Sequence, residues 1–186
     1  MSYIAFDYWK FAEELRPDYC KKIIDLAENK WIKGEVSDEE NHKSNRDAWT
    51  YFTNEEWIYD IVFEYMRRAN EYSNWNFKID AAEGLQITKY ETNGYQEYHY
   101  DGDGYTRHNM PHADLLHDKT RKLSMSIILN DDFEGGQLEF MNNPNSIEDK
   151  LGTIVVFPSY MQHRVRPVTS GTRYSLVTWF VGEPFQ

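Results

Sequence analysis

Residues 163–180 read HRVRPVTSGTRYSLVTWF and contain two strand-like runs separated by residues 169–171. Runs rich in Val, Thr, Tyr, Phe and Trp are typical of β-strands, and a three-residue loop that ends in glycine is typical of a β-hairpin. The pattern predicts a hairpin in which Val168 pairs with Thr172. This hairpin places the polar residues of the two runs relative to one another.

Arg173 begins the second run, and alternation places it on one face with Ser175, Val177 and Trp179. In the predicted hairpin His163 lies opposite Val177, so Arg173 is about four residues, or roughly 13 Å, farther along the strand. A two-residue loop would turn Arg173 to the other face. Most arginines are solvated surface charges, but a guanidinium on this face can hold a carboxylate by two parallel hydrogen bonds.

An earlier strand-like run ends in His99-Tyr100-Asp101. Since side chains alternate along a strand, His99 and Asp101 point to the same face and Tyr100 to the other. Together with His163 they supply two imidazoles and one carboxylate, the set that holds a non-heme Fe(II) and leaves coordination positions open. A His-X-Asp triplet also occurs by chance, and Asp101 also begins the turn sequence Asp-Gly-Asp-Gly. The prediction of an iron site therefore depends on His163 and Arg173 as well.

Composition narrows the class of protein. The 186 residues suffice for one domain with a hydrophobic core, and 40% hydrophobic and 16% aromatic residues argue against disorder. The net charge of -11 argues against partners such as nucleic acid or an anionic membrane surface. The one cysteine, Cys20, permits no internal disulfide, and the sequence shows neither a membrane-spanning run nor a signal sequence. We therefore expect a cytoplasmic protein.

The first third of the chain is predicted to be helical. Pro17 suits the first turn of a helix, and Thr53 with Glu56 matches a capping box. Residues 34–45 are polar without periodicity and are predicted to form a loop. Apolar residues recur at helical spacing after both helix starts: Cys20, Ile23, Ile24, Leu26 and Ala27 in the first, and Trp57, Ile58, Ile61, Val62, Tyr65, Met66 and Ala69 in the second.

From about Gly84 the pattern changes to short strands separated by Gly, Pro, Asn and Asp. Helices followed by strands predict an α+β, mainly β fold, with the N-terminal helices packed on one sheet of a sandwich or barrel. The predicted strands cover residues 84–91, 95–101, 122–130, 136–141, 152–157, 162–168 and 172–181.

Three segments together resemble a known family. The C-terminal stretch quoted above resembles the signature of the prolyl 4-hydroxylase-like 2-oxoglutarate oxygenases, which include the bacterial PKHD-type hydroxylases. LSMSIILNDDFEGGQLEF (123–140) resembles the central strands of that family, and KYETNGYQEYHYD (89–101) resembles the segment that ends in its iron motif. The resemblance covers about residues 84–182 and implies a double-stranded β-helix, or jelly roll. It implies a single domain, 1–186, with a helical support region at 1–80 and the dioxygenase core at 84–182.

Carried to this chain, the resemblance implies His99, Asp101 and His163 as iron ligands and as catalytic residues together with Arg173. Arg173 would hold the distal carboxylate of 2-oxoglutarate, with Tyr90 as a hydrogen-bond partner and Ser175 as a lining residue. The implied cofactors are Fe(II), 2-oxoglutarate as co-substrate and O2, with ascorbate as a further candidate. One departure is that residues 127–129 are aliphatic, whereas some prolyl hydroxylases have a tyrosine here that reaches the co-substrate.

The resemblance implies hydroxylation of a C–H bond with release of succinate and CO2, and its prolyl hydroxylase branch favours a peptidyl proline as substrate. Two alternatives stay open: a hydroxylase of a free amino acid or small metabolite, and a non-catalytic metal-binding jelly roll. Arg173 argues against the second, since a bare metal site has no need of a diacid clamp. The partner is thus a peptide or a small molecule, and the oligomeric state is left open.

The segment 102–120 follows the iron motif and contains three histidines. Their spacing keeps no regular face, so they are interpreted as loop residues near the entrance of the site rather than as a second metal centre. Asp103 could compete with Asp101 as a ligand, but the turn glycines place it beyond the strand. We expect this segment and residues 34–45 to flank the mouth of the site. The three histidines are His108, His112 and His117.

Overall fold

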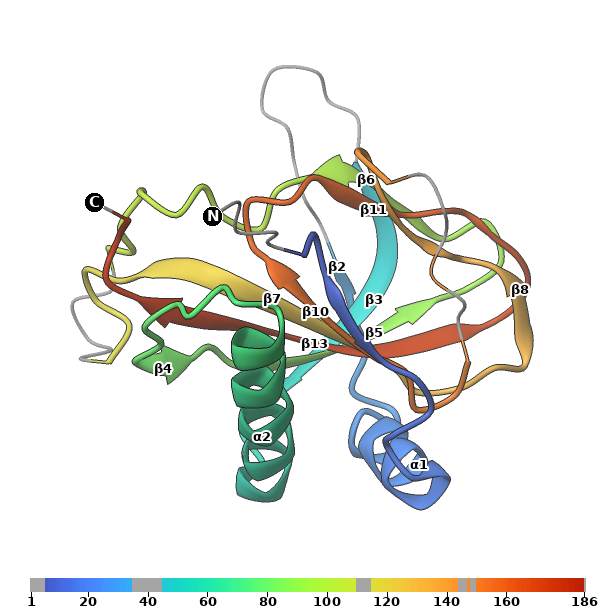
Figure 1. Cartoon of the computed structure of the whole chain (residues 1–186). Helices are drawn as coiled ribbons and strands as arrows, with labels where there is room; N and C mark the ends of the chain where they lie inside the picture. Colours follow the sequence, from blue (N-terminus) through green and yellow to red (C-terminus); the bar gives the residue numbers. More distant parts are fainter. Residues whose placement is uncertain (1–5, 35–44, 110–114, 144–146, 148–149, 186) are drawn as a thin grey trace.

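The computed structural model describes residues 6–34, 45–109, 115–143, 147 and 150–185 (Figure 1). In this part of the chain a curled antiparallel sheet is flanked by two helices, so the prediction of a mainly β fold is confirmed. The elements are β1 (Trp9–Phe11), α1 (Pro17–Leu26), β2 (Ile32–Gly34), β3 (Arg46–Thr53), α2 (Glu56–Tyr72), β4 (Ala81–Ala82), β5 (Leu85–Tyr90), β6 (Tyr95–His99), β7 (Thr120–Ile128), β8 (Phe133–Gly135), β9 (Leu138–Phe140), β10 (Ile154–Pro158), β11 (His163–Val165), β12 (Val168–Gly171) and β13 (Arg173–Gly182).

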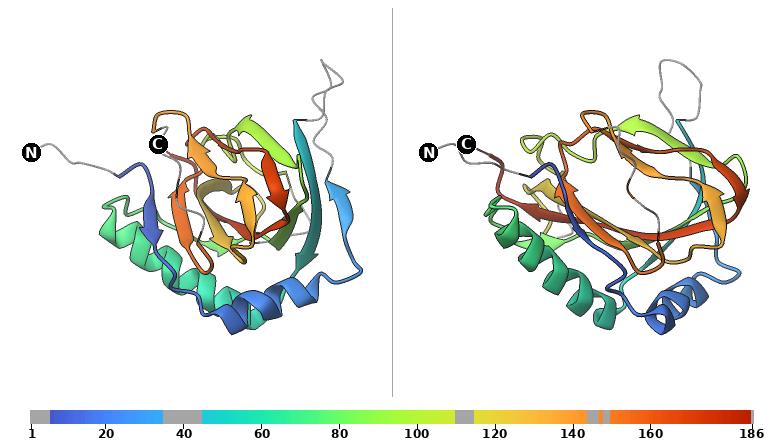
Figure 2. Two further views of the ribbon diagram at one scale, coloured as in Figure 1. Left: turned by 90° about the vertical axis from the view of Figure 1, so that its right-hand side faces the viewer. Right: turned by 45° about the vertical axis from the view of Figure 1, so that its right-hand side comes forward.

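The main sheet curls because strand β3 belongs to both of its walls. The strand order is β1-β10-β7-β13-β5-β3-β6-β11-β9. The first two residues of β3 pair with β6, and residues from Trp49 onward pair with β5. Figure 2 shows the result as two walls that face each other across an interior. One wall contains β7, β13 and β5, and the other contains β6, β11 and β9.

The C-terminal hairpin predicted from the sequence is wrong in its pairing. Strand β12 pairs with β8, β11 pairs with β6 and β9, and β13 pairs with β5 and β7. The chain therefore crosses from one wall to the other at residues 169–171 instead of folding back on itself. Gly171, the glycine that ends the predicted loop, adopts a left-handed conformation with φ of +78°, where an added Cβ would lie 2.6 Å from the carbonyl oxygen of Asp132.

Both predicted helices form and cover the outside of one wall (Figures 1 and 2). Pro17 occupies the first turn of α1, and the buried Cys20 and Ile23 share one face of that helix. Helix α2 buries residues at a spacing of three and four, as an amphipathic helix does. Burial of each large aliphatic side chain stabilises the fold by about 1.5–3 kcal/mol. The buried residues of α2 are Ile58, Val62, Met66 and Ala69.

Two features of the first third differ from the prediction. The segment is not wholly helical, because strands β1, β2 and β3 lie in it. The predicted capping box is absent, since Thr53 is the last residue of β3 and the helix is capped at Glu55 without a side-chain bond. The predicted loop at 34–45 lies almost wholly outside the described residues.

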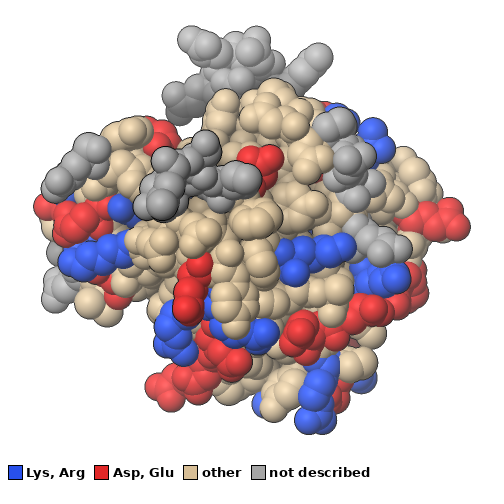
Figure 3. Space-filling model, in the orientation of Figure 1, with Lys and Arg blue, Asp and Glu red and all other residues tan. Residues whose placement is uncertain are grey.

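Besides a small cluster of Ala48, Tyr90, Val165 and Val168, the hydrophobic core of the described residues has two main parts. The larger lies between the helices and the outer surface of the β7–β13 wall, with residues such as Ile127, Leu176 and Phe180. The smaller lies inside the curled sheet and includes Phe140 and Phe157. None of the helices in the described residues is long and apolar enough to cross a membrane. On the face in Figure 3, acidic and basic side chains are interspersed, most densely over the helical layer.

Candidate metal centre

Strands β6 and β11 bring two histidines side by side inside the curled sheet. His99 is the last residue of β6 and His163 is the first of β11, and the two residues face each other in the antiparallel pairing. Their ring centroids are 4.3 Å apart. The prediction that His163 lies opposite Val177 is therefore wrong, and the actual pairing brings the imidazoles closer.

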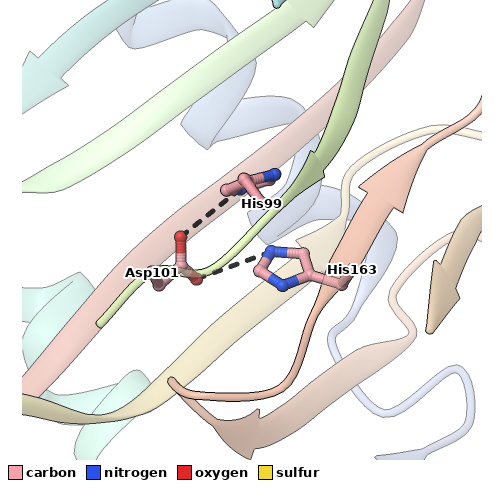
Figure 4. Close-up of side chains that lie close together, drawn as sticks. All are labelled: His99, Asp101 and His163. Atoms are coloured by element: carbon pink, nitrogen blue, oxygen red, sulfur yellow. Dashed lines mark ion pairs between the residues drawn. The ribbon is translucent and has the colours of Figure 1, made fainter. Parts of the chain in front are cut away.

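Asp101 completes the cluster from the segment that follows β6 (Figure 4). Its Oδ1 lies 3.5 Å from Nε2 of His99, and its Oδ2 lies 3.6 Å from Nε2 of His163. One ligand atom from each of the three side chains lies within 4.8 Å of the other two. Two imidazole nitrogens and a carboxylate oxygen at this spacing can share one divalent ion, so the donor set suits Fe(II).

Backbone carbonyls orient both imidazoles. Nδ1 of His99 lies 2.8 Å from the carbonyl oxygen of Glu97, and Nδ1 of His163 lies 2.9 Å from that of Met161. A carbonyl can only accept, so Nδ1 is the protonated nitrogen in each ring and Nε2 is left as the ligand atom. Each histidine thus takes its orienting group from the residue two positions earlier in the chain.

Three neighbours hold Asp101. The backbone N–H donates to the carbonyl oxygen of Ser159 at 3.1 Å, and the backbone carbonyl accepts from Nη1 of Arg121 at 3.1 Å. The carboxylate accepts a hydrogen bond from Ser124, whose hydroxyl is also 3.0 Å from that of Ser159. Asp101 lies beyond the end of β6, so these contacts, rather than strand pairing, fix its position.

The charges of the cluster suit a metal ligand set. Burial alone would raise the pKa of Asp101, but the neighbouring imidazoles of His163 and His99 outweigh burial and hold it far below the ordinary value. Burial lowers the pKa of His163, which favours the neutral ring that a metal requires. Burial opposes protonation of His99 as well, but the carboxylate of Asp101 raises its pKa on balance.

An irregularity in β6 turns an extra side chain toward the cluster. His163 pairs with His99, but Val165 pairs with Gln96, so two residues of β6 stand opposite the single residue Arg164. Such a β-bulge breaks the alternation of side chains. As a result Gln96 and His99, three positions apart, both line the interior pocket.

Glu139 of β9 contacts Tyr98 and Arg164, the outward-facing residues next to His99 and His163. Its carboxylate accepts a hydrogen bond from Tyr98 at 2.8 Å, and it lies 3.1 Å from Nη2 of Arg164 and 2.7 Å from Nε of Arg166. Tyr98 precedes His99 and Arg164 follows His163. The buried carboxylate therefore links the backs of β6 and β11 at the position of the cluster.

Arg173 lies in the same pocket on the opposite wall. It is the first residue of β13, is 1% exposed, and lines the pocket together with His99, Asp101 and His163. The predicted face of β13 is confirmed, because Ser175, Val177 and Trp179 line the pocket as well.

Both residues predicted to accompany Arg173 contact it. Nη1 of Arg173 donates to the Ser175 hydroxyl at 3.1 Å, and the guanidinium carbon lies 5.6 Å from the centre of the Tyr90 ring. Tyr90 faces Arg173 across the pairing of β5 with β13. The backbone of Gly136, with φ of +70°, passes so close that an added Cβ would lie 2.8 Å from Cδ of Arg173.

Several residues that line the pocket were not predicted from the sequence, among them three with long polar side chains. Arg46 and Gln86 line the pocket from β3 and β5, and Gln96 lines it because of the bulge. Arg46 lies in residues 46–53, for which no strand was predicted. The alternation of apolar residues in RDAWTYFT is the signal that could have placed it on a strand.

The segment after the iron motif does not form a second metal centre among its described residues. His108 Nε2 lies 3.2 Å from Glu83, and His117 is near Asp118 on the surface. His112 lies outside the described residues.

The carboxylate of Asp103 forms its hydrogen bonds within its own turn. Its carboxylate accepts hydrogen bonds from the backbone of Tyr105 and from the backbone and hydroxyl of Thr106. These bonds lower its pKa to about 2. As expected from the turn glycines, Asp103 stays apart from the histidine cluster.

Comparison with known proteins supports the chemistry of the donor set. The sequence pattern of the 2OG-Fe(II) oxygenase superfamily matches residues 85–181. A protein of Acanthamoeba polyphaga mimivirus, provisionally named as a prolyl 4-hydroxylase, is 25% identical over 178 residues, which cover 89% of this chain and 70% of the relative. PKHD-type hydroxylases of Psychrobacter sp. (strain PRwf-1) and Synechococcus sp. (strain CC9902) are 37% and 39% identical over 42% of this chain. These matches span only 33% and 36% of the two bacterial proteins.

Solved structures share the fold. The viral collagen prolyl hydroxylase of Paramecium Bursaria Chlorella virus-1 has a TM-score of 0.72 at 19% identity, with 95% of this chain and 97% of that chain covered. A Trichoplax adhaerens prolyl hydroxylase, solved with a peptide fragment of the hypoxia inducible factor oxygen degradation domain, has a TM-score of 0.69 at 16% identity, with 94% and 83% covered. The predicted jelly roll is confirmed.

Proposed function

Because the chain belongs to the 2OG-Fe(II) oxygenase superfamily, we propose that it hydroxylates proline in a peptide. The family makes it an oxygenase that uses Fe(II), 2-oxoglutarate and O2. The observation that carries the proposal is the convergence of His99, Asp101 and His163 in one pocket with the buried Arg173.

In this proposal Nε2 of His99, Nε2 of His163 and a carboxylate oxygen of Asp101 hold the iron. The donor set fits, since the carboxylate stays ionised and Nδ1 of each ring is engaged by a carbonyl. When bound, Fe(II) with 2-oxoglutarate activates O2, and one oxygen atom enters a C–H bond while the co-substrate leaves as succinate and CO2. The chain supplies binding, orientation and shielding from water.

Arg173 would take the distal carboxylate of 2-oxoglutarate. Its planar guanidinium can donate two parallel hydrogen bonds to a carboxylate. Ser175 and Tyr90 restrict its side chain from two sides, and at 1% exposure it is shielded from bulk water. A charge pair in such a place is weakened little by dissolved salt.

The preference for a peptidyl proline is supported by the relatives. Two of the similar folds are prolyl hydroxylases, and one of these was solved with a peptide. Prolyl peptides are extended in advance of binding, so little conformational entropy is lost when they are held. The net charge of -11 favours a neutral or basic peptide over an acidic one.

The test is incubation of proline-containing peptides with the protein, Fe(II), 2-oxoglutarate and O2. We expect mass spectrometry to show one added oxygen atom on proline, with an equal amount of succinate formed. If free amino acids or small metabolites gain the oxygen and peptides do not, the peptidyl assignment is wrong and the oxygenase assignment stands. Absence of succinate with every substrate, and without substrate, would support a non-catalytic metal-binding module.

A matched pair of variants tests the ligand assignment separately. Asp101→Asn should abolish Fe(II) binding and succinate formation, because an amide lacks the charge that a metal ligand of this kind provides. Asp103→Asn changes the same group two residues away, where the carboxylate is bound to its own turn, and should retain Fe(II). Equal loss of Fe(II) in both variants would argue against Asp101 as a ligand.

A further inference from the structure

Four aromatic side chains form a pocket on the surface beside the metal centre. Phe77, Tyr105, Tyr160 and Phe185, together with Asp103, line a space of about 470 Å³. We call this set the aromatic pocket. Tyr105 is 64% exposed and Tyr160 is 42% exposed, so two of its rings face solvent. None of these four rings lines the pocket that contains the histidine cluster and Arg173, so the proposed function gives them no role.

The aromatic pocket is built around Phe185. The ring of Phe185 meets those of Phe77, Tyr105 and Tyr160 edge-on, with centroids 5.0, 6.1 and 6.2 Å away. Its backbone N–H donates to the carbonyl oxygen of Gly104 at 2.9 Å. An added Cβ at Gly104 would lie 2.4 Å from the Phe185 ring. The C-terminal end and the segment after the iron motif therefore lie side by side, at the left of Figure 1.

A buried lysine supports the aromatic pocket from below. Nζ of Lys122 lies 4.1 Å from the centre of the Phe185 ring and 6.0 Å from that of Phe77. Lys122 is 6% exposed, so this contact with the rings is shielded from water and correspondingly favourable. The rings of Phe185 and Phe77 are thus held in place before any partner arrives, which lowers the entropic cost of binding one.

The aromatic pocket is linked to the metal centre through lining residues that neighbouring pockets share. Asp103 also lines an adjoining space of about 320 Å³, whose wall includes Tyr100, Asp101 and Arg121. Asp101 in turn lines the pocket that holds the histidine cluster. Gly104 is three positions after Asp101 in the chain, so their Cα atoms are at most about 11 Å apart. A polyproline II chain covers that span with three to four residues at about 3.1 Å each.

The chemistry of the pocket indicates what it binds. Rings with exposed hydroxyl groups are the surfaces on which proline-rich segments dock, because the pyrrolidine ring packs on an aromatic face and the free peptide carbonyls accept from tyrosine. Asp103 lines the pocket, and Asp7 lies close enough for its charge to act on Tyr160. These carboxylates favour a basic or neutral neighbour over an acidic one.

We propose that the aromatic pocket docks a proline-rich, neutral or basic stretch of the substrate peptide, a few residues away from the proline that is hydroxylated. This assignment rests on the proposed function, which it deepens by naming the sequence around the target. The aromatic pocket would then select substrate peptides by residues of the peptide that are not themselves hydroxylated.

The experiment measures binding without turnover, under nitrogen, with Fe(II) and 2-oxoglutarate present. The probes are a lysine-containing proline-rich peptide of about ten residues, which spans roughly 30 Å, and a peptide of the same length with alanine in place of all prolines but the target. The variant is the double substitution Tyr105→Ala and Tyr160→Ala. The control is Tyr72→Ala, which removes a ring that is 50% exposed on helix α2.

We expect the double variant to bind the proline-rich peptide about tenfold more weakly, since two aromatic anchors are lost, and Tyr72→Ala to bind it as the unaltered protein does. The alanine-containing peptide should bind more weakly than the proline-rich one to the unaltered protein, and about equally to the double variant. Equal affinity of the double variant and the unaltered protein for the proline-rich peptide would overturn the assignment.

Other occupants give different results. Concentration-dependent self-association that the double substitution abolishes would assign the pocket to a second copy of this chain and overturn the peptide assignment. If the unaltered protein hydroxylates a small metabolite and binds neither peptide, the proposed substrate has failed and this inference fails with it. If peptides are hydroxylated but the two tyrosines make no difference, the proposed function stands and only the docking site is wrong.

Discussion

At the scale of single residues, Arg173 offers the sharpest test of the proposed co-substrate site. Arg173→Lys keeps the positive charge but loses the two-pronged donor, so one charge-assisted hydrogen bond worth about 1.5–3 kcal/mol is lost. We expect affinity for 2-oxoglutarate to fall about 10- to 100-fold, and affinity for Fe(II) to change much less. Calorimetric titration of each ligand measures both.

Arg164→Lys is the matched control for Arg173→Lys. Arg164 also lies on a strand of the curled sheet, but its guanidinium is bound to Glu139 on the outer surface. That substitution should leave affinity for 2-oxoglutarate intact. An unchanged affinity in Arg173→Lys would mean that another cation, such as Arg46 in the same pocket, holds the distal carboxylate.

Ser124 is a second single-residue test. Its hydroxyl donates to the Asp101 carboxylate, and groups that orient a metal ligand contribute about 10- to 100-fold to metal affinity. We expect Ser124→Ala to weaken Fe(II) binding by about tenfold. Ser73→Ala also removes a buried serine hydroxyl that donates to a backbone carbonyl, and it should leave Fe(II) binding unchanged. Equal Fe(II) affinity in both variants would contradict an orienting role.

Much of the residue-level site could be predicted from the sequence. Alternation along one strand grouped Arg173 with Ser175. It also grouped His99 with Asp101, but in the structure Asp101 lies beyond the end of β6 and is held by contacts outside the strand. Gln96 could not be predicted in this way, since the bulge that turns it inward depends on the pairing of β6 with β11. The orienting carbonyls of Glu97 and Met161 are backbone groups, so no residue type marks them.

At the scale of elements, Glu139 connects three strands. Glu139→Gln removes the charge from its bonds to Arg164 and Arg166, at a cost of about 1–3 kcal/mol. Because the network backs His99 and His163, we expect faster hydrogen exchange in β6 and β11 and several-fold weaker Fe(II) binding. Exchange in β7 and β13, on the other wall, should not change.

A surface ion pair serves as the control for Glu139. Glu183→Gln removes an exposed partner of Lys119 and should change neither exchange in β6 and β11 nor Fe(II) affinity. If Glu139→Gln behaves like Glu183→Gln, the strands keep their positions without the network.

The element-level prediction failed where pairing is non-local. Seven strand runs after residue 84 were recognised from local composition, but their partners were not. The hairpin at 169–171 was inferred from a turn-like sequence, whereas the chain there crosses between the two walls. Strand β3 was not predicted, because it lies between a polar segment without periodicity and a clear helix.

At the scale of the whole molecule, Cys20 links burial to stability at high pH. It lies fully buried in the core beneath the helices, and this burial raises the pKa of its thiol to about 11 from 9.0. Between these values the unfolded chain loses the proton while the folded chain keeps it, so stability falls as pH rises from about 9 to 11. The loss from this group amounts to about 2–3 kcal/mol.

Cys20→Ala removes the titrating group. Its cavity should lower stability at pH 8, but the difference from the unaltered protein should shrink as pH rises through 9 to 11. Urea unfolding at several pH values measures this. If the free energies of unfolding of the two proteins change in parallel with pH across that range, Cys20 does not titrate differently in the folded and unfolded states.

Gly136 shows how far a requirement for a small ligand can reach into the backbone. It contributes no donor and no charge, yet the stem of Arg173 lies where its side chain would be. In a saturation library selected for turnover, position 136 should tolerate as few substitutions as the arginine itself. The same library selected only for soluble expression should tolerate more of them, because a displaced arginine leaves the two walls paired. A map of mutational tolerance would thus mark a residue with no side chain as part of the proposed co-substrate site.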